Sequence, residues 1–164
     1  MEAPMNRWLD KAPGIALLLL LTMGVAVGFA RQSRWPSGVN DQAVEVSRLL
    51  WNLQEAHLTL EGRHFSSEDL ERSTGGTIAD LIKSAGFEQV QIVCGPDNWK
   101  ATFQGEGHRF LVAGGTQLFL FRLASETDLS RAPPARDVLE TGEIPGGELL
   151  LKETPVSLFN RRRR

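Results

Sequence analysis

Histidine and cysteine are the residues of this chain best suited to ligate metals or act as nucleophiles, and there are few of them. The histidines are His57, His64 and His108, and the single cysteine is Cys94. Zinc-type sites need three or four such ligands at short spacings, and the sequence contains no HExxH motif, paired cysteines or histidine–carboxylate cluster. Cys94 alternates with apolar residues, as a small buried side chain would. We predict no metal ion and no cofactor.

Motifs for other kinds of chemistry are also missing. The sequence has no GxSxG nucleophile elbow and no GxxxxGK[ST] phosphate loop, and Gly105-Glu106-Gly107 is typical of a hairpin turn. Glu68 and Asp69 suit the first turn of a helix, where they complement its dipole. The absence of tyrosine disfavours a base-stacking platform for nucleic acid. We therefore predict that the protein is not an enzyme, with no catalytic residues, no identifiable small-molecule substrate and no nucleic-acid partner.

A long amphipathic helix is predicted from Asn40 to about Glu61, with Gly62 ending it. Its apolar stripe must be covered, either by a sheet, which its short length favours, or by another helix in a coiled coil. Two short helices are expected next, one beginning at Ser66 or Ser67 and one over about 77–85. The stripe consists of Val39, Ala43, Val46, Leu50, Leu53 and Leu60, with His57 in the series.

After Gly86 the hydrophobic period changes from helical to two, which predicts β-strands. Four are expected, over about 87–94, 99–104, 108–113 and 116–123, with turn residues such as Gly114-Gly115 between them. Loops this short need antiparallel neighbours. The predicted fold class is α+β, with the long helix packed on a four-stranded antiparallel sheet. The predicted core is Val46, Leu50, Leu53, Leu60, Phe65, Leu70, Leu81, Val90, Ile92, Trp99, Phe103, Phe110, Val112 and Leu120.

Before this domain lies a run of nineteen uncharged residues, Ala12 to Ala30. As a helix it would cover about 28 Å, close to the ~30 Å of a bilayer's hydrocarbon core, so we predict one transmembrane helix. A cleaved secretory signal is the alternative, because small residues precede Arg31. Aromatic residues at the membrane interface are expected to be Trp8 and Trp35. Small residues that allow another helix to dock are Gly14, Ala16, Gly24, Ala26 and Gly28.

The chain after residue 124 is predicted to be an extended arm, because prolines and glycines interrupt every periodicity. The arm nevertheless holds apolar residues, which would lie on its own domain, as an added strand, or on a partner. These residues are Leu149, Leu150, Leu151, Val156, Leu158 and Phe159. The arm ends in arginines suited to anionic lipid headgroups or to an acidic partner, namely Arg161, Arg162, Arg163 and Arg164.

Several segments resemble type IV pilins and pseudopilins. They are LTLEGRHFSSEDL at the end of the long helix, CGPDNWKATF around the first strand turn, and HRFLVAGGTQLFLF in the last predicted hairpin. The resemblance covers about Asp41 to Arg122 and implies a helix packed against an antiparallel sheet. The GFTLIE-type processing sequence of pilin precursors has no match, and the uncharged run lacks the acidic residue that guides pilin assembly.

The expected organisation is a cytoplasmic N-terminus (1–11), a transmembrane helix (12–30), a juxtamembrane linker (31–39), a pilin-like α+β domain (40–124) and the extended arm (125–164). The expected location is a bacterial inner membrane, single-pass, with the C-terminal domain in the periplasm. The expected function is that of a non-enzymatic accessory subunit of a larger membrane complex, for example a photosynthetic or respiratory one, with the lipid bilayer and other subunits as partners. The alternative is a divergent pseudopilin or minor pilin of a secretion or pilus machine.

Overall fold

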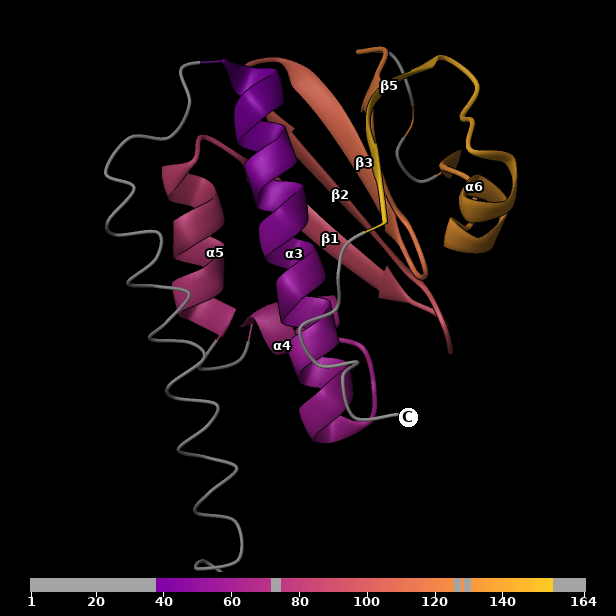
Figure 1. Ribbon diagram of the computed structural model, residues 1–164. Helices are drawn as coiled ribbons and strands as arrows, with labels where there is room; N and C mark the ends of the chain where they lie inside the picture. Colours follow the sequence, from indigo (N-terminus) through magenta and orange to yellow (C-terminus); the bar gives the residue numbers. More distant parts are fainter. Residues whose placement is uncertain (1–37, 72–74, 126–127, 129–130, 155–164) are drawn as a thin grey trace, which may run out of the picture. The chain divides into compact units, whose positions relative to one another are not determined.

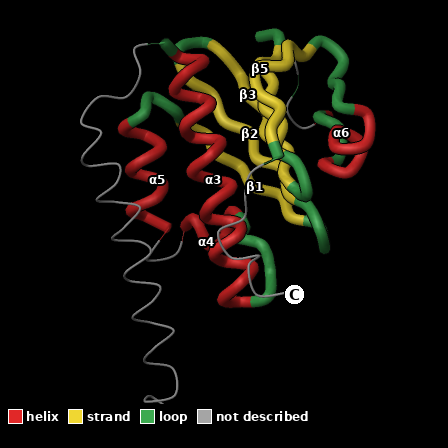
Figure 2. Tube along the Cα trace, in the orientation of Figure 1, coloured by secondary structure: helices red, strands yellow, loops and turns green. Residues whose placement is uncertain are grey.

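The computed structural model describes residues 38–71, 75–125, 128 and 131–154. Its helices are α3 (Val39–Glu61), α4 (Ser67–Glu71), α5 (Gly75–Ser84) and α6 (Ala135–Thr141) (Figure 1). Its strands are β1 (Glu88–Cys94), β2 (Trp99–Gly105), β3 (His108–Gly114), β4 (Leu118–Leu123) and β5 (Gly147–Glu153). They form one antiparallel sheet in the order β1-β2-β3-β4-β5. Figure 2 shows α3, α4 and α5 on one side of the sheet and α6 on the other.

Helix α3 begins and ends close to the predicted residues. Gly62 follows it in the left-handed conformation, with φ 71°, and its N–H donates to the Leu58 carbonyl at 3.0 Å. This is the conformation that favours glycine after a helix. The apolar stripe packs on the sheet, where Ala43, Val46 and Leu50 are fully buried. Four residues of the predicted core are only half-buried, namely Leu53, Leu60, Leu81 and Val90.

Both faces of the sheet bury apolar side chains, which explains why β2 to β4 are buried almost throughout. Alternate residues such as Phe103, Phe110 and Leu120 belong to one face, and Leu111, Phe119 and their neighbours belong to the other. The second face forms a core with α6 and the turn after it, made of Leu111, Ala113, Phe119, Phe121, Leu123, Val138 and Ile144. The sequence predicted only the first of these two layers.

The predicted four-stranded sheet with an extended arm is wrong, because the sheet has a fifth strand built from the arm. Strand β5 runs antiparallel to β4, with Leu151 opposite Leu120 and Leu149 opposite Phe121. The chain before β5 folds into α6, which Gly142 ends at φ 70°. These apolar residues are buried better by strand pairing than they would be in a free tail, and the prolines and glycines serve as helix and turn boundaries.

The prediction of a transmembrane helix is also corrected for the part of the chain that the structure describes, where no helix is long and apolar enough to cross a membrane. Helix α3 has 23 residues, but its sequence is not continuously apolar, because it contains charged residues such as Asp41, Glu45 and Arg48. What the structure describes is a domain built on one sheet of five antiparallel strands. The run Ala12–Ala30, with the interface tryptophans and docking residues predicted around it, lies outside the described residues.

Candidate functional site

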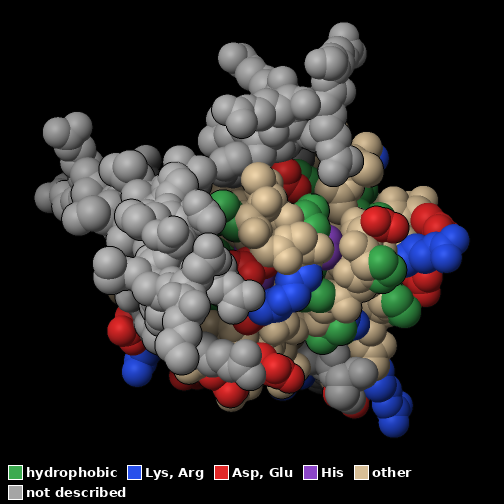
Figure 3. Space-filling model, turned by 90° about the horizontal axis from the view of Figure 1, so that it is seen from below, with side chains coloured by type: hydrophobic (Ala, Val, Ile, Leu, Met, Phe, Trp, Pro, Cys, Tyr) green, Lys and Arg blue, Asp and Glu red, His purple; other side chains and the backbone are tan. Residues whose placement is uncertain are grey.

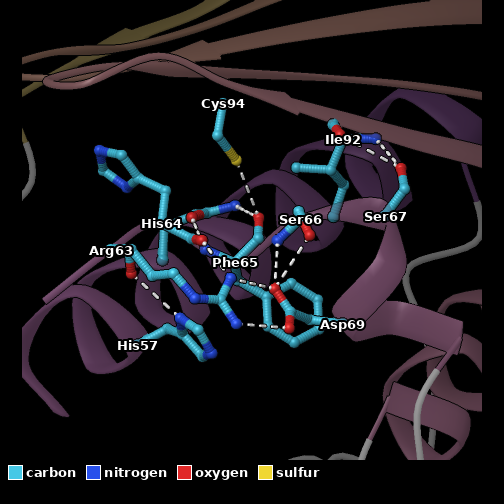
Figure 4. A network of polar contacts seen from close by, with 10 residues as sticks. His57, Arg63, His64, Phe65, Ser66, Ser67, Asp69, Ile92 and Cys94 are labelled. Carbon is cyan, nitrogen blue, oxygen red and sulfur yellow. Dashed lines mark hydrogen bonds and ion pairs between the residues drawn. The ribbon is translucent and has the colours of Figure 1, made fainter. Parts of the chain in front are cut away.

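Most of the residues singled out for their chemistry gather around the loop of residues 62–66, which joins α3 to α4. Figure 4 shows His57 from α3, His64 from the loop, Asp69 from α4 and Cys94 from β1 around it. His108 lies on β3, outside this group. The loop is short because Gly62 ends α3 and Ser66 immediately begins the hydrogen bonding of α4. The fold thus brings together residues from three elements.

Arg63 and Asp69 form the strongest polar contact at this loop. The guanidinium donates two bonds to the carboxylate, Nη1 to Oδ2 at 2.6 Å and Nη2 to Oδ1 at 2.8 Å. The Ser66 N–H and hydroxyl also donate to Oδ2, at 2.9 and 3.0 Å. The Arg63 hydrogen bonds, followed by those from Ser66, hold the pKa of the Asp69 carboxyl well below its usual range. Asp69 therefore stays ionised at neutral pH and caps the start of α4.

Gln54 of α3 fixes the loop from its other side. Its Nε2 donates to the Phe65 carbonyl at 2.7 Å, and its Oε1 accepts from the Phe65 N–H at 2.8 Å. Gln54 is 1% exposed, so breaking this pair would leave buried polar groups without partners. His57 adds a contact, with Nδ1 3.0 Å from the Arg63 carbonyl and its ring edge-on to Phe65. The loop backbone is thereby tied to α3 at two points, Arg63 and Phe65.

Cys94 donates its thiol hydrogen to the Phe65 carbonyl, with Sγ 3.1 Å from the oxygen. The residue is exposed overall, which differs from the buried position that we predicted. Its sulfur nevertheless lies partly within the structure, and this burial is the main reason that the pKa of the thiol rises to about 11. The thiolate is the nucleophilic and metal-binding form. At neutral pH this thiol is therefore a hydrogen-bond donor and not a nucleophile.

His64 is the unusual member of the group. His64 is only 7% exposed, and neither nitrogen of its ring has a hydrogen-bond partner among the described residues. Burial lowers the pKa of the imidazole, while the charges of Glu55 and Asp97 act in the opposite direction. A neutral imidazole is therefore favoured at this position.

The loop also leads directly to the outer edge of β1. Ser67, the first residue of α4, accepts a hydrogen bond from the Ile92 N–H at 2.7 Å and donates one to the Ile92 carbonyl at 3.2 Å. The two residues are 25 positions apart, and no short motif marks such a pair. Sequence reasoning missed this contact. The only related signals were the alternating pattern of β1 and the Ser-rich turn before α4, and neither of them indicates that the two meet.

The described residues contain no group of three or more histidine, cysteine, aspartate or glutamate side chains placed to hold a metal ion. Two shallow hollows lie elsewhere. One of about 210 Å³ is lined by residues that include Glu88, Gln104 and Arg109. One of about 170 Å³, between α3 and β5, is lined by Arg48, Trp51, Asn52 and Glu153. Seen from below (Figure 3), positive and negative side chains alternate over the visible described surface, with a histidine among them.

The apolar residues predicted for partner binding are divided by the structure. Leu149, Leu150 and Leu151 lie in β5, where Leu149 is 45% exposed and the other two are half-buried. The remaining arm residues Val156, Leu158 and Phe159 lie outside the described residues, as do the four terminal arginines. Half of the predicted partner-binding segment therefore packs on its own domain and leaves one leucine open on an edge strand.

Comparison with known proteins finds no protein-family model, no curated protein and no solved structure that matches this chain. The resemblance to type IV pilins stays a prediction from the sequence.

Proposed function

We propose that this protein is a non-enzymatic structural subunit of a larger protein complex at a bacterial inner membrane, with its folded domain on the periplasmic side. The nineteen-residue uncharged run near the N-terminus supports the membrane location. At the loop of residues 62–66, the functional groups of Asp69, Arg63 and Gln54 are engaged in holding the fold, which supports a structural role.

The observation that carries this proposal is the exposed Leu149 on β5. Strand β5 is the last strand of the sheet, and an edge strand that presents an apolar side chain is suited to contact with another protein. The acidic residues of this strand are paired with arginines, Glu148 with Arg122 and Glu153 with Arg48. A partner subunit that presents an apolar patch therefore fits the exposed Leu149.

Gentle detergent extraction of the full-length chain, followed by size-exclusion chromatography and identification of co-eluting proteins, tests the proposal. We expect the wild-type chain to elute in a large complex and Leu149→Lys to elute mostly free of it. Val93→Lys is the matched control, because Val93 is an exposed apolar residue, 57% accessible, on the opposite edge strand β1. Elution of the wild-type chain as a free monomer would overturn the proposal.

A divergent pseudopilin or minor pilin is the second candidate, favoured by the long amphipathic helix packed along an antiparallel sheet. Mass spectrometry of the mature N-terminus separates the two candidates. Cleavage near the start of the uncharged run, with a methylated new terminus, would support the pilin class. An intact or unmethylated terminus supports the structural subunit.

A further inference from the structure

His64 lies between two fixed points of the loop. On one side, the Arg63 guanidinium is held by Asp69, and on the other, the Phe65 backbone is held in both directions by Gln54. The position of the imidazole is therefore set by its neighbours and not by hydrogen bonds of its own, since neither ring nitrogen has a partner among the described residues. A buried polar group of this kind is costly when neutral and much more so when charged.

The charges that act on the His64 imidazole come from two parts of the fold. Helix α3 contributes Glu55 and His57, and the turn between β1 and β2 contributes Asp97. Asp97 is exposed, and Glu55 is half-buried. A protonated imidazole would gain from moving outward toward these carboxylates, whereas a neutral one gains from staying inside. Two positions of one side chain, favoured by different protonation states, are what a pH-dependent switch requires.

Movement of His64 would act on β1 through α4. Only two residues separate His64 from Ser67, whose hydroxyl bonds to both backbone groups of Ile92. Strand β1 has β2 on its other side and is the first strand of the sheet. Ser67 therefore covers the outer edge of β1 at Ile92, and loosening the loop would remove that cover.

We propose that His64 is an acid-sensitive latch, whose protonation moves the imidazole out of its buried position, loosens the loop of residues 62–66 and uncovers the outer edge of β1 at Ile92. The unfavourable burial of the imidazolium supplies the driving force for this movement. The carboxylates of Glu55 and Asp97 attract the imidazolium in its new position. An uncovered edge is the kind of surface to which another strand can add. The latch rests on this geometry alone and is independent of the structural role proposed above.

Amide hydrogen exchange on the full-length chain, followed by NMR at about pH 7.5 and about pH 5 on either side of the histidine range, tests the latch. After correction for the intrinsic pH dependence of exchange, we expect protection at the Ile92 and Phe65 amides to fall about tenfold or more in acid. His64→Leu, which keeps an apolar side chain inside, should abolish this fall. His108→Gln removes a half-buried histidine on β3 and should leave it unchanged.

An equal loss of protection in His64→Leu and wild type would overturn the proposal, as would full protection of wild type at the lower pH. If His64→Leu does not fold, an NMR pH titration of the wild type alone still tests the latch. The ring proton resonances of His64 should titrate over the same pH range in which the Ile92 amide loses protection. Titration of His64 without any change at Ile92 would also overturn the latch.

Discussion

The hydroxyl of Ser67 takes the place of a neighbouring strand at Ile92. It accepts a hydrogen bond from the Ile92 N–H at 2.7 Å and donates one to the Ile92 carbonyl at 3.2 Å. A serine hydroxyl can do both at once, because it carries one donor and two acceptor lone pairs. At the edge of the sheet these backbone groups would otherwise need water or another chain. A helix of five residues thus covers the edge of β1 at Ile92.

Replacing Ser67 by alanine should therefore weaken the fold more than an ordinary surface change. Both partners at Ile92 would lose their bonds, and we expect a loss of about 1–3 kcal/mol in the free energy of unfolding. Urea denaturation measures this loss. Ser84→Ala is the matched control, since its hydroxyl bonds only to the Leu81 carbonyl in the exposed last turn of α5. Equal effects of the two substitutions would contradict a special role for Ser67.

The low pKa of Asp69 predicts a loss of stability in acid. Its folded-state pKa lies below the unfolded value of about 3.9, so its stabilising contribution is complete above that pH and is lost as the pH falls below it. We expect Asp69→Asn to be less stable than wild type at neutral pH and to vary less in stability below about pH 4.

Urea unfolding of both proteins at neutral and acid pH measures this difference. The exposed Glu71, on the same short helix, supplies the control Glu71→Gln, which should follow the wild type across the whole range. The effect lies below the pH range of histidine, so it is separate from the behaviour proposed for His64. Parallel curves for Asp69→Asn and wild type would show that the Arg63–Asp69 pair adds nothing.

Cys94 should react slowly with alkylating reagents. Its thiol pKa of about 11, against an ordinary value of 9.0, reduces the thiolate fraction near pH 8 about a hundredfold. We expect iodoacetamide to modify the folded chain about a hundred times more slowly than the urea-unfolded chain, followed by mass spectrometry. Gln54→Ala removes one anchor of the Phe65 carbonyl, which accepts the thiol hydrogen, and should accelerate the reaction. Equal rates for folded and unfolded chains would contradict the raised pKa of the Cys94 thiol.

The elements with strong local signals were predictable from the sequence. Gly62 and the helical stripe located α3, and the period-two pattern with Gly114-Gly115 located β1 to β4. Helix α6 was missed because Pro134 and Gly142 were interpreted as breaks in an extended arm, and β5 corresponds to the added strand that was only one of two alternatives for that arm. In the structure Pro134 precedes α6 and Gly142 follows it, so these two residues mark the boundaries of a helix. Only pairing with β4 gives the leucines of β5 a place in the fold.

The candidate site was less predictable than the fold. Asp69 and the serines before it carried a local signal, because a capping arrangement needs only residues three apart. The contacts of Gln54 with Phe65 and of Ser67 with Ile92 join residues 11 and 25 positions apart. Composition and spacing contain no information about such contacts until the helix and the sheet have been placed against each other.

Gly114 offers a test of how tightly the layer beneath α3 is packed. It stands opposite Trp99 in the register of β2 and β3, and a Cβ atom there would lie 2.3 Å from Cε2 of the Trp99 ring. Trp99 is 1% exposed, so the ring cannot move aside into solvent. We expect Gly114→Ala to lower the free energy of unfolding by about 3 kcal/mol through overpacking.

Two further variants separate this steric effect from glycine's conformational freedom. Gly107→Ala places a Cβ in open space at φ 76°, so it should cost only the backbone strain of about 1 kcal/mol. Trp99→Leu removes the ring that a residue at 114 would strike. In urea denaturation, the cost of Gly114→Ala should therefore be much smaller in the Trp99→Leu background, with a coupling free energy above about 1 kcal/mol. Strictly additive effects would mean that the clash with Trp99 is not what requires glycine at this position.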